Sequence, residues 1–292
     1  MKLMDFKNGK ELLELCNTYQ LSISDIMKKR EADFTDRSSK EILEKMNQIW
    51  KIMKESAALP LISTTKSVGG LIGGEAMLLS QNTQNSSLLC GSVLHKAIMY
   101  SMAVLEVNAS MGVIVAAPTA GSSGIVPGLL LAMQEEYGFN DDMIITALFN
   151  AGAIGYLAMR NATVAGAVGG CQAEVGIASS MAASACVELL HGSPTQCLNA
   201  ASTVLMNCLG LVCDPVAGLV EYPCQLRNAS GVSNALTAAA IALSSVPQLI
   251  PFDEMLSTMY SVGKRIPVEL RETALGGCAI TPSACMAGSC CI

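Results

Sequence analysis

The chain has 292 residues, of which 51% are apolar, 14% charged and 4% aromatic, and its formal net charge is −6. This length and apolar content can bury a large core and exclude low-complexity disorder. The acidic balance argues against general nucleic-acid binding, which needs a basic face. The 12 cysteines are spread along a long chain and do not describe a small disulfide-stapled fold.

Charged side chains concentrate in residues 1–60, which carry 11 Lys and Arg and 10 Asp and Glu, half of all those in the chain. Mixed polar and apolar positions predict amphipathic helices over 11–19, 24–32 and 38–54. We expect residues 1–60 to form charged outer helices of the same domain as a densely buried body over 61–292. The first ten residues are charged and have no apolar core, so no signal peptide is expected.

Three long segments without charged side chains raise the question of a membrane: 107–134, 189–213 and 228–252. A spanning helix needs roughly 20 mostly apolar residues. Pro118 and Pro127 break the first segment and Pro194 breaks the second, so the pieces fit buried core helices better. We therefore expect no membrane span, and free or metal-bound thiols in a reducing cytoplasm.

Small residues dominate the rest of the chain, which predicts a compact all-α domain with functional Gly, Ser and Cys loops. Ser193, Pro194 and Gln196 form a capping-box pattern at the start of a helix that should end near residue 209. Asp253 is expected to cap a helix ending near residue 263. The other predicted helices cover 92–105, 143–159, 173–190 and 233–243.

A loop over residues 116–128 packs Gly, Ser and Thr together before an apolar helical stretch. Such a loop can present backbone N–H groups and hydroxyls at a helix N-terminus, which suits a carboxylate or phosphate. It is not a Walker A loop, since no Gly-Lys-Ser/Thr follows. A tight turn between buried helices explains the pattern equally well. The candidate binding residues are Thr119, Gly121, Ser122, Ser123 and Gly124.

Three cysteines, Cys171, Cys213 and Cys224, lie beside Gly or Pro at the start or end of helical segments. Loop thiols in a reducing compartment suggest a metal site, although the C-x2-C units of zinc ribbons and ferredoxins are absent and free thiols remain the alternative. Five others fall within helical patterns and are expected to be small buried apolar residues: Cys16, Cys90, Cys186, Cys197 and Cys208.

Few other titratable groups are available. His95 within a predicted helix and His191 at a helix end are interpreted as structural. Lys66 is the only cation between Lys54 and Lys96 and lies in a Ser/Thr/Gly loop. Charged or polar groups in apolar runs are costly unless paired. Those in this chain are Asn108, Glu174 and Asp214, the last two of which can also be helix caps.

These motifs stand in an order that resembles the α chain of the bacterial iron–sulfur-dependent L-serine dehydratases, over about residues 21–282. The segments that carry the resemblance are 108–112 (NASMG), 118–128 (PTAGSSGIVPG), 169–176 (GGCQAEVG), 213–218 (CDPVAG), 223–224 (PC), 271–273 (RET) and 276–277 (GG).

The resemblance implies an all-α catalytic fold that converts L-serine to pyruvate and ammonia. It also implies a [4Fe–4S] cluster held by Cys171, Cys213 and Cys224, with one iron left open to act as a Lewis acid on the substrate hydroxyl. We expect the loop over 119–124 to hold the serine carboxylate, with Lys66 and Asn108 nearby as candidate catalytic residues.

Two departures from the single-chain relatives matter. Their accessory β-type domain is absent here, so we expect a partner β subunit that carries the catalytic base, and an oligomer. Cys285 falls near a C-terminal Cys that occupies the open iron in some relatives. Whether it does so here stays open, as do the roles of Cys278, Cys290 and Cys291. A related lyase acting on cysteine, or a non-catalytic Fe–S electron carrier, are the alternatives.

Overall fold

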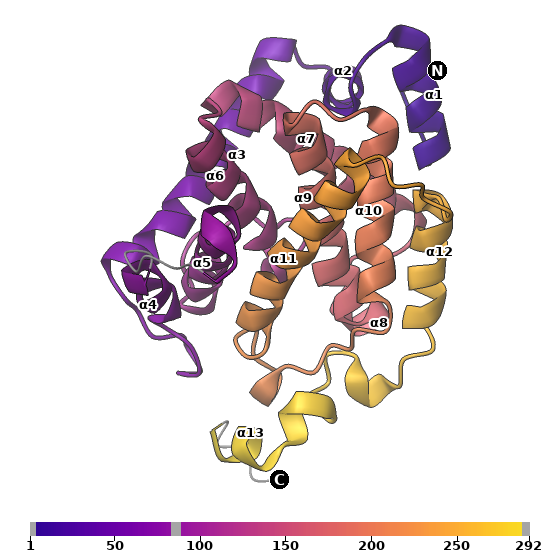
Figure 1. Cartoon of the computed structure of the whole chain (residues 1–292). Coiled ribbons are helices and arrows are strands. Elements are labelled where there is room, and N and C mark those ends of the chain that lie inside the picture. Colours follow the sequence, from indigo (N-terminus) through magenta and orange to yellow (C-terminus); the bar gives the residue numbers. More distant parts are fainter. Residues whose placement is uncertain (1–3, 83–88, 288–292) are drawn as a thin grey trace.

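The computed structural model describes residues 4–82 and 89–287, and within them it is built of α-helices with no named strand (Figure 1). Cys213 and Arg271 form an isolated parallel bridge. The all-α prediction is confirmed. The helices are α1 (Gly9–Tyr19), α2 (Ile23–Thr35), α3 (Ser39–Ile62), α4 (Glu75–Asn82), α5 (Gly91–Ala109), α6 (Ile125–Tyr137), α7 (Asp141–Asn161), α8 (Gly166–Gly169), α9 (Cys171–Leu189), α10 (Pro194–Cys208), α11 (Cys224–Leu243), α12 (Phe252–Gly263) and α13 (Pro282–Ala287).

The centre of the molecule is α9, which packs against α6, α7, α10 and α11. All of its 19 residues are buried except Glu174 and Glu188. Small side chains allow such close packing: a Cβ on Gly128 of α6 would lie 2.8 Å from the backbone nitrogen of Ser101 in α5. A helix surrounded on all sides can position its first residue, Cys171, with little freedom.

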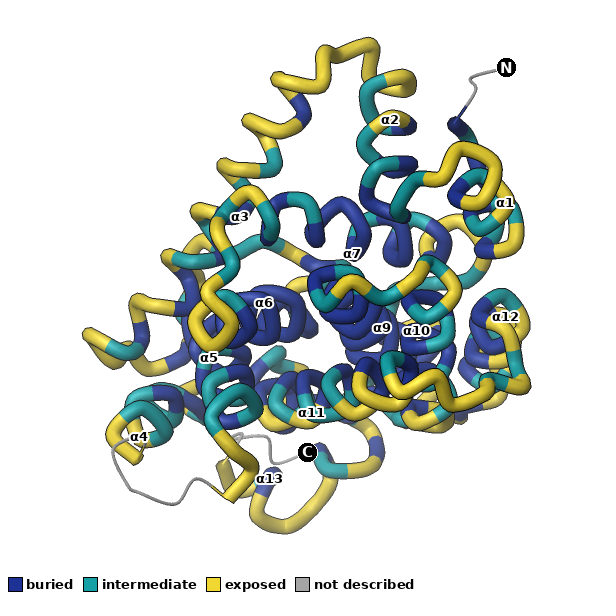
Figure 2. The backbone as a smooth tube through the Cα atoms, turned by 45° about the horizontal axis from the view of Figure 1, so that its top comes forward, coloured by how far each residue is buried: buried dark blue, intermediate teal, exposed yellow. Residues whose placement is uncertain are grey.

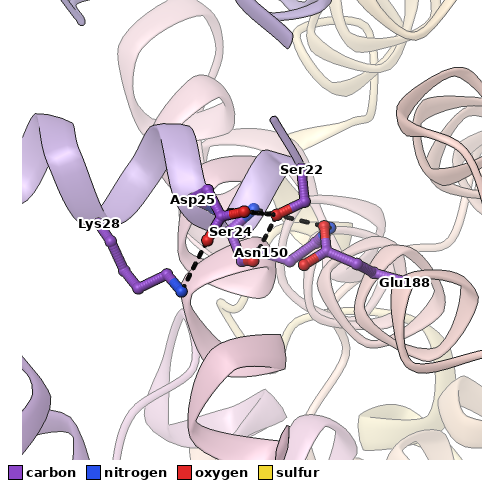
Figure 3. Close-up of polar contacts among 6 residues, drawn as sticks. All are labelled: Ser22, Ser24, Asp25, Lys28, Asn150 and Glu188. Carbon is purple, nitrogen blue, oxygen red and sulfur yellow. Dashed lines mark hydrogen bonds and ion pairs between the residues drawn. The ribbon is translucent and has the colours of Figure 1, made fainter. Parts of the chain in front are cut away.

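Glu188, at the far end of α9 from Cys171, joins this helix to two others (Figure 3). Its carboxylate accepts hydrogen bonds from the backbone N–H of Ser24 in α2 (3.3 Å) and from the side-chain amide of Asn150 in α7 (2.6 Å). Burial raises the pKa of Glu188. The buried polar group is satisfied, as buried carboxyl groups must be.

The N-terminal helices cover the outside of this centre, and the first half of α3 is largely exposed (Figure 2). α2 packs on α7, and α3 packs on α5. All three helices predicted in this part are present. α3 runs further than predicted, to Ile62, with Pro60 in its last turn.

The capping box at Ser193 is confirmed, with both reciprocal hydrogen bonds to Gln196 present. The prediction that Asp253 caps its own helix is wrong. Pro251 takes the N-cap position of α12, and the Asp253 carboxylate accepts from the N–H groups of Gly9 (2.7 Å) and Lys10 (3.0 Å). It therefore caps α1, a partner that local sequence cannot reveal.

Other boundaries differ as well. α11 begins at Cys224 rather than near residue 233. Ser, Asn and Gly in its first half hide the helical pattern, because these residues favour caps and turns elsewhere. Cys90 is exposed at the N-cap of α5 and is not the buried residue predicted, whereas Cys16, Cys186, Cys197 and Cys208 are buried.

Among the described residues, α7 is the one helix long and apolar enough to cross a membrane, and 67% of its apolar window is buried inside the molecule. This is weak evidence for a span, because an interior helix has the same length and composition. The three charge-free segments considered from the sequence do not supply such a helix.

Candidate functional site

Two of the three predicted ligand cysteines lie together. Cys171 is the first residue of α9, and Cys213 lies in the loop after α10. Their sulfur atoms and a carboxylate oxygen of Glu174 all lie within 4.8 Å of one another. Cys171 is 2% exposed and Cys213 is 3% exposed. Two thiols and a carboxyl this close form a donor set that suits a thiophilic metal.

Glycines clear the space that this group needs. A Cβ on Gly166 would lie 2.6 Å from Glu174 Oε2 and 3.0 Å from Cys213 Sγ. Gly170 has a φ of +75°, and a Cβ there would meet the Leu211 carbonyl oxygen at 2.8 Å. Only glycine meets both demands of that position, the left-handed backbone and the close approach.

The Cys213 loop is held between α9 and the C-terminal segment. The Cys213 N–H donates to the Leu270 carbonyl (2.9 Å), and the Glu272 N–H donates to the Cys213 carbonyl (2.7 Å). On the other side the Gln172 N–H donates to the Leu211 carbonyl (3.0 Å). These bonds fix the backbone around Cys213 before any ligand arrives.

The sequence did not single out Arg227, which lies one turn into α11 and touches the cysteine group. Its guanidinium donates to Cys171 Sγ (3.4 Å) and pairs with Asp214 (2.6 Å). Asp214 is therefore the ion-pair partner of Arg227. A signal for Arg227 was available, because it is the only charged residue between Glu221 and Asp253 and a lone charge needs a partner.

The surroundings of Cys171 and Cys213 shift the pKa values of their thiols in opposite directions. A hydrogen bond donated by Cys213, with the charge of Arg227, lowers the pKa of Cys171. The same hydrogen bond, together with burial, raises the pKa of Cys213. Burial also raises the pKa of Glu174. Cys171 is thus the readier thiolate, and thiolates are the form that binds metals.

Cys224, the third predicted ligand, is the first residue of α11 and is 7% exposed. It is not one of the three residues whose ligand atoms lie within 4.8 Å of one another in the described part of the chain. Burial, together with the charges of Cys171 and Glu174, raises the pKa of Cys224 to about 12. The structure thus places Cys224 in the electrostatic neighbourhood of the group.

The Ser/Gly loop adjoins the cysteine group at Glu174. A Cβ on Gly121 would lie 3.6 Å from Glu174 Oε1, and the Thr119 side chain hydrogen-bonds to the same carboxyl. The Thr119 and Ser122 hydroxyls are 3.1 Å apart, and Ser123 donates to the Ala120 carbonyl (2.7 Å). The loop forms a 3-10 turn, Ala120–Ser122, immediately before α6.

Asn228 of α11 fixes the same loop from the other side. Its side-chain amide donates to the Gly121 carbonyl (2.8 Å), and its oxygen accepts from the Gly124 N–H (3.1 Å). Asn228 also donates to the carbonyl of Cys224 (2.9 Å). One buried amide thus joins the candidate anion loop to the helix that begins with a candidate metal ligand.

Lys66 is exposed in the loop between α3 and α4. Glu221 holds this loop by accepting from the Ser67 hydroxyl (2.6 Å) and the Gly69 N–H (2.6 Å). Asn108 is partly buried in the last turn of α5. Within the described residues, neither the Lys66 nor the Asn108 side chain is hydrogen-bonded to the cysteine group.

None of the remaining candidates that the structure describes belongs to the Cys171–Glu174–Cys213 group. Cys285 is half-buried in α13, and its thiol donates weakly to the Ala279 carbonyl (3.9 Å). Cys290 and Cys291 lie outside the described residues. His95 is buried and lies 3.0 Å from the Leu79 carbonyl oxygen, whereas His191 is exposed after α9.

Comparison with known proteins decides the family. The sequence model described as "Serine dehydratase alpha chain" matches residues 18–279. The chain belongs to the serine dehydratase alpha chain family. This family membership confirms the resemblance drawn from the cysteine and Ser/Gly segments.

Named relatives of this serine dehydratase alpha chain family member differ in length. A probable L-serine dehydratase, alpha chain, of Bacillus subtilis is 45% identical over 95% of this chain and 92% of its own length. The L-serine dehydratase, alpha chain, of Peptoniphilus asaccharolyticus is 44% identical over 93% of each. The L-serine dehydratase TdcG of Escherichia coli is 38% identical over 94% of this chain but only 62% of its own length.

Proposed function

We propose that this protein is the α chain of an L-serine dehydratase, which eliminates water from L-serine to give pyruvate and ammonia. The observation that carries the proposal is the meeting of the Cys171–Glu174–Cys213 group with the Ser/Gly loop at Glu174. The first offers donors for a metal, and the second offers hydroxyl and amide groups for a carboxylate. Relatives at 44–45% identity carry the matching name over nearly the same length.

Within this proposal Cys171, Cys213 and Cys224 hold a [4Fe–4S] cluster. Thiolates are the usual protein ligands of iron–sulfur clusters. The surroundings fit a negatively charged group, because Arg227 touches Cys171 and the buried Nε of Arg271 has no hydrogen-bond partner in the described part of the chain. When bound, the iron without a protein thiolate supplies a Lewis acid that eases the departure of hydroxide.

The chain's own residues then bind and orient the amino acid. The Thr119 and Ser122 hydroxyls exchange their contact with each other (3.1 Å) for hydrogen bonds donated to the substrate carboxylate, and Asn228 holds the loop in place. Ser122 is 0% exposed, so its hydroxyl is held inside the loop. Such preorganised donors lose little entropy when substrate binds.

The group that removes the Cα proton is proposed to lie on a partner β chain. The relatives of similar length are named alpha chains, and the chain spans 62% of a longer relative. Neither histidine belongs to the group of candidate metal ligands in the described part of the chain. An active site completed across a subunit interface, in a cytoplasmic oligomer, accounts for these features.

The proposal is tested anaerobically with the full chain, with and without its β chain, after reconstitution with iron and sulfide. We expect pyruvate from L-serine only with both the cluster and the β chain. Cys213→Ser should abolish turnover, while Cys186→Ser, a buried thiol outside the site, should retain it. A four-iron cluster with no turnover of L-serine in either preparation would overturn the proposed substrate.

A further inference from the structure

Arg227 and Asp214 form a buried ion pair that contacts the cysteine group. The Arg227 side chain is 15% exposed and the Asp214 side chain 3% exposed, with 2.6 Å between their charged atoms. Burying two charges carries a large desolvation cost, and a buried pair on average adds little net stability. A contribution to stability therefore does not explain why this pair is buried. The other contacts of Arg227 and Asp214 indicate its role.

Each contact of the Arg227 guanidinium leads to a candidate ligand. One nitrogen donates both to Cys171 Sγ (3.4 Å) and to the carbonyl of Val212 (2.9 Å), the residue before Cys213. The other pairs with Asp214, the residue after Cys213. Because Arg227 itself follows Cys224 by less than one helical turn, a single side chain connects the regions of all three cysteines.

Asp214 orients the guanidinium and is itself held in place. Its second carboxylate oxygen accepts the Cys278 N–H at 2.6 Å. Gly277, with a φ of +61°, brings the backbone so close that a Cβ there would collide with the Asp214 carboxylate. The aspartate thus has one oxygen for Arg227 and the other for the C-terminal segment.

We propose that Arg227, oriented by Asp214, is a positioning residue for the metal group: it holds Cys171 and the Cys213 loop at ligand distance and donates a hydrogen bond to the Cys171 sulfur. The inference rests on the proposed function for the identity of the metal group. It does not require serine to be the substrate.

Two effects follow if Arg227 acts this way. Outer-shell partners of metal ligands typically change metal affinity 10- to 100-fold when removed. Hydrogen bonds to cluster sulfur are one of the factors that set the reduction potential, and they favour the more negative, reduced form. Lysine cannot replace the guanidinium, because it lacks the planar fork that contacts Cys171 and Asp214 together.

The test compares wild type with Arg227→Met, Arg227→Lys and Asp214→Asn, and uses Arg265→Met as the control because Arg265 is exposed. The first measurement titrates the full-length apo-protein with Co²⁺ and follows the thiolate-to-cobalt absorption. We expect at least ten-fold weaker binding in the three site variants and no change in the control. This readout needs neither the cluster nor the β chain.

The second measurement reconstitutes the cluster anaerobically and determines iron per chain, its loss to a chelator and the midpoint potential. We expect faster iron loss and a lower potential in Arg227→Met and Arg227→Lys. Far-UV circular dichroism identifies variants that fail to fold. If Arg227→Met does not fold, the more conservative variants Arg227→Lys and Asp214→Asn provide the test.

The outcomes separate the two proposals. If the folded variants keep the wild-type Co²⁺ affinity, iron content and midpoint potential, the proposed role of Arg227 is overturned. This holds even if the enzyme turns over L-serine. Weakened Co²⁺ binding in a protein that never turns over serine would support Arg227 while the proposed substrate fails.

Discussion

At the scale of single residues, Asn228 and Glu221 connect the parts of the candidate site. Each is buried, and each satisfies the backbone of a distant loop: the Ser/Gly loop for Asn228 and the Lys66 loop for Glu221. Both lie within a few residues of Cys224. A displacement of this short segment would therefore move the anion loop and the Lys66 loop together.

The Ser/Gly loop gives the first prediction at this scale. Thr119→Val with Ser122→Ala removes two hydroxyls proposed to bind the serine carboxylate, each worth about 1 kcal/mol. We expect KM for L-serine to rise roughly ten-fold or more with an unchanged iron content. Steady-state kinetics of the reconstituted enzyme measure it, with Ser233→Ala as the control because its hydroxyl donates within α11. An unchanged KM would remove the carboxylate role of the loop.

Single residues were predictable where chemistry and neighbouring glycines coincide. Cys171 and Cys213 were selected from the sequence, and the structure brings them together with Glu174. The Arg227 contact was not predicted, because its partners lie on other segments and local sequence carries no distance information. Lys66, selected for its isolation in the sequence, is held in a loop whose donors are used by Glu221.

At the scale of secondary-structure elements, Asp141 joins three helices. Its carboxylate, in the first turn of α7, accepts from Trp50 Nε1 of α3 (3.0 Å) and from the side chain of Gln134 in α6 (2.8 Å). It also pairs with Lys54 of α3 (2.7 Å). The Lys54 contact, the other hydrogen bonds and the charge of Lys54 lower the pKa of Asp141 to about 2.

Asp141→Asn should therefore destabilise the protein by about 0.5–1 kcal/mol at neutral pH, a modest effect because the side chain is partly exposed. Since the folded-state pKa is below the unfolded value of 3.8, the stabilisation is fully present above pH 4 and is lost as pH falls toward 2. Urea unfolding followed by Trp50, the only tryptophan, measures the difference.

Asp142→Asn is the matched control, because Asp142 is exposed in the same turn. A wild-type advantage over Asp141→Asn that stays constant from pH 6 to pH 3 would contradict the assignment to this carboxylate.

Helices with strong end signals were predicted well. The Ser193–Gln196 capping box correctly located the start of α10. The start of α11 was missed, because helical residues such as Asn228 and Gly231 serve the site and the packing rather than local propensity. Gly231 lies so close to Ile125 of α6 that a Cβ there would meet its side chain at 2.6 Å.

At the scale of the whole molecule, α1 and α12 close the fold from opposite ends of the chain. Asp253 supplies the cap for the first turn of α1 in addition to the local cap from Asn8. In Figure 1, α1 and α13 lie at opposite ends of the molecule. The two regions should therefore respond independently to substitution.

Asp253→Ala should lower the free energy of unfolding by about 1 kcal/mol, the usual value of a lost N-cap side chain. Iron content and KM should stay at wild-type values. Chemical denaturation measures the loss, with Glu254→Ala as the control because this neighbouring carboxylate is exposed. Equal stability of the two variants would show that the contact between α1 and α12 contributes nothing.

Because α9 is buried on all sides, its backbone amides are protected from exchange with solvent. Neighbouring helices surround α9, so no local fluctuation can expose its central backbone amides without separating several of them. Their protons can then exchange with solvent only when the whole domain unfolds. Because this helix begins at Cys171, a ligand bound there in the native state alone would slow exchange along the entire helix, far beyond the residues that it touches.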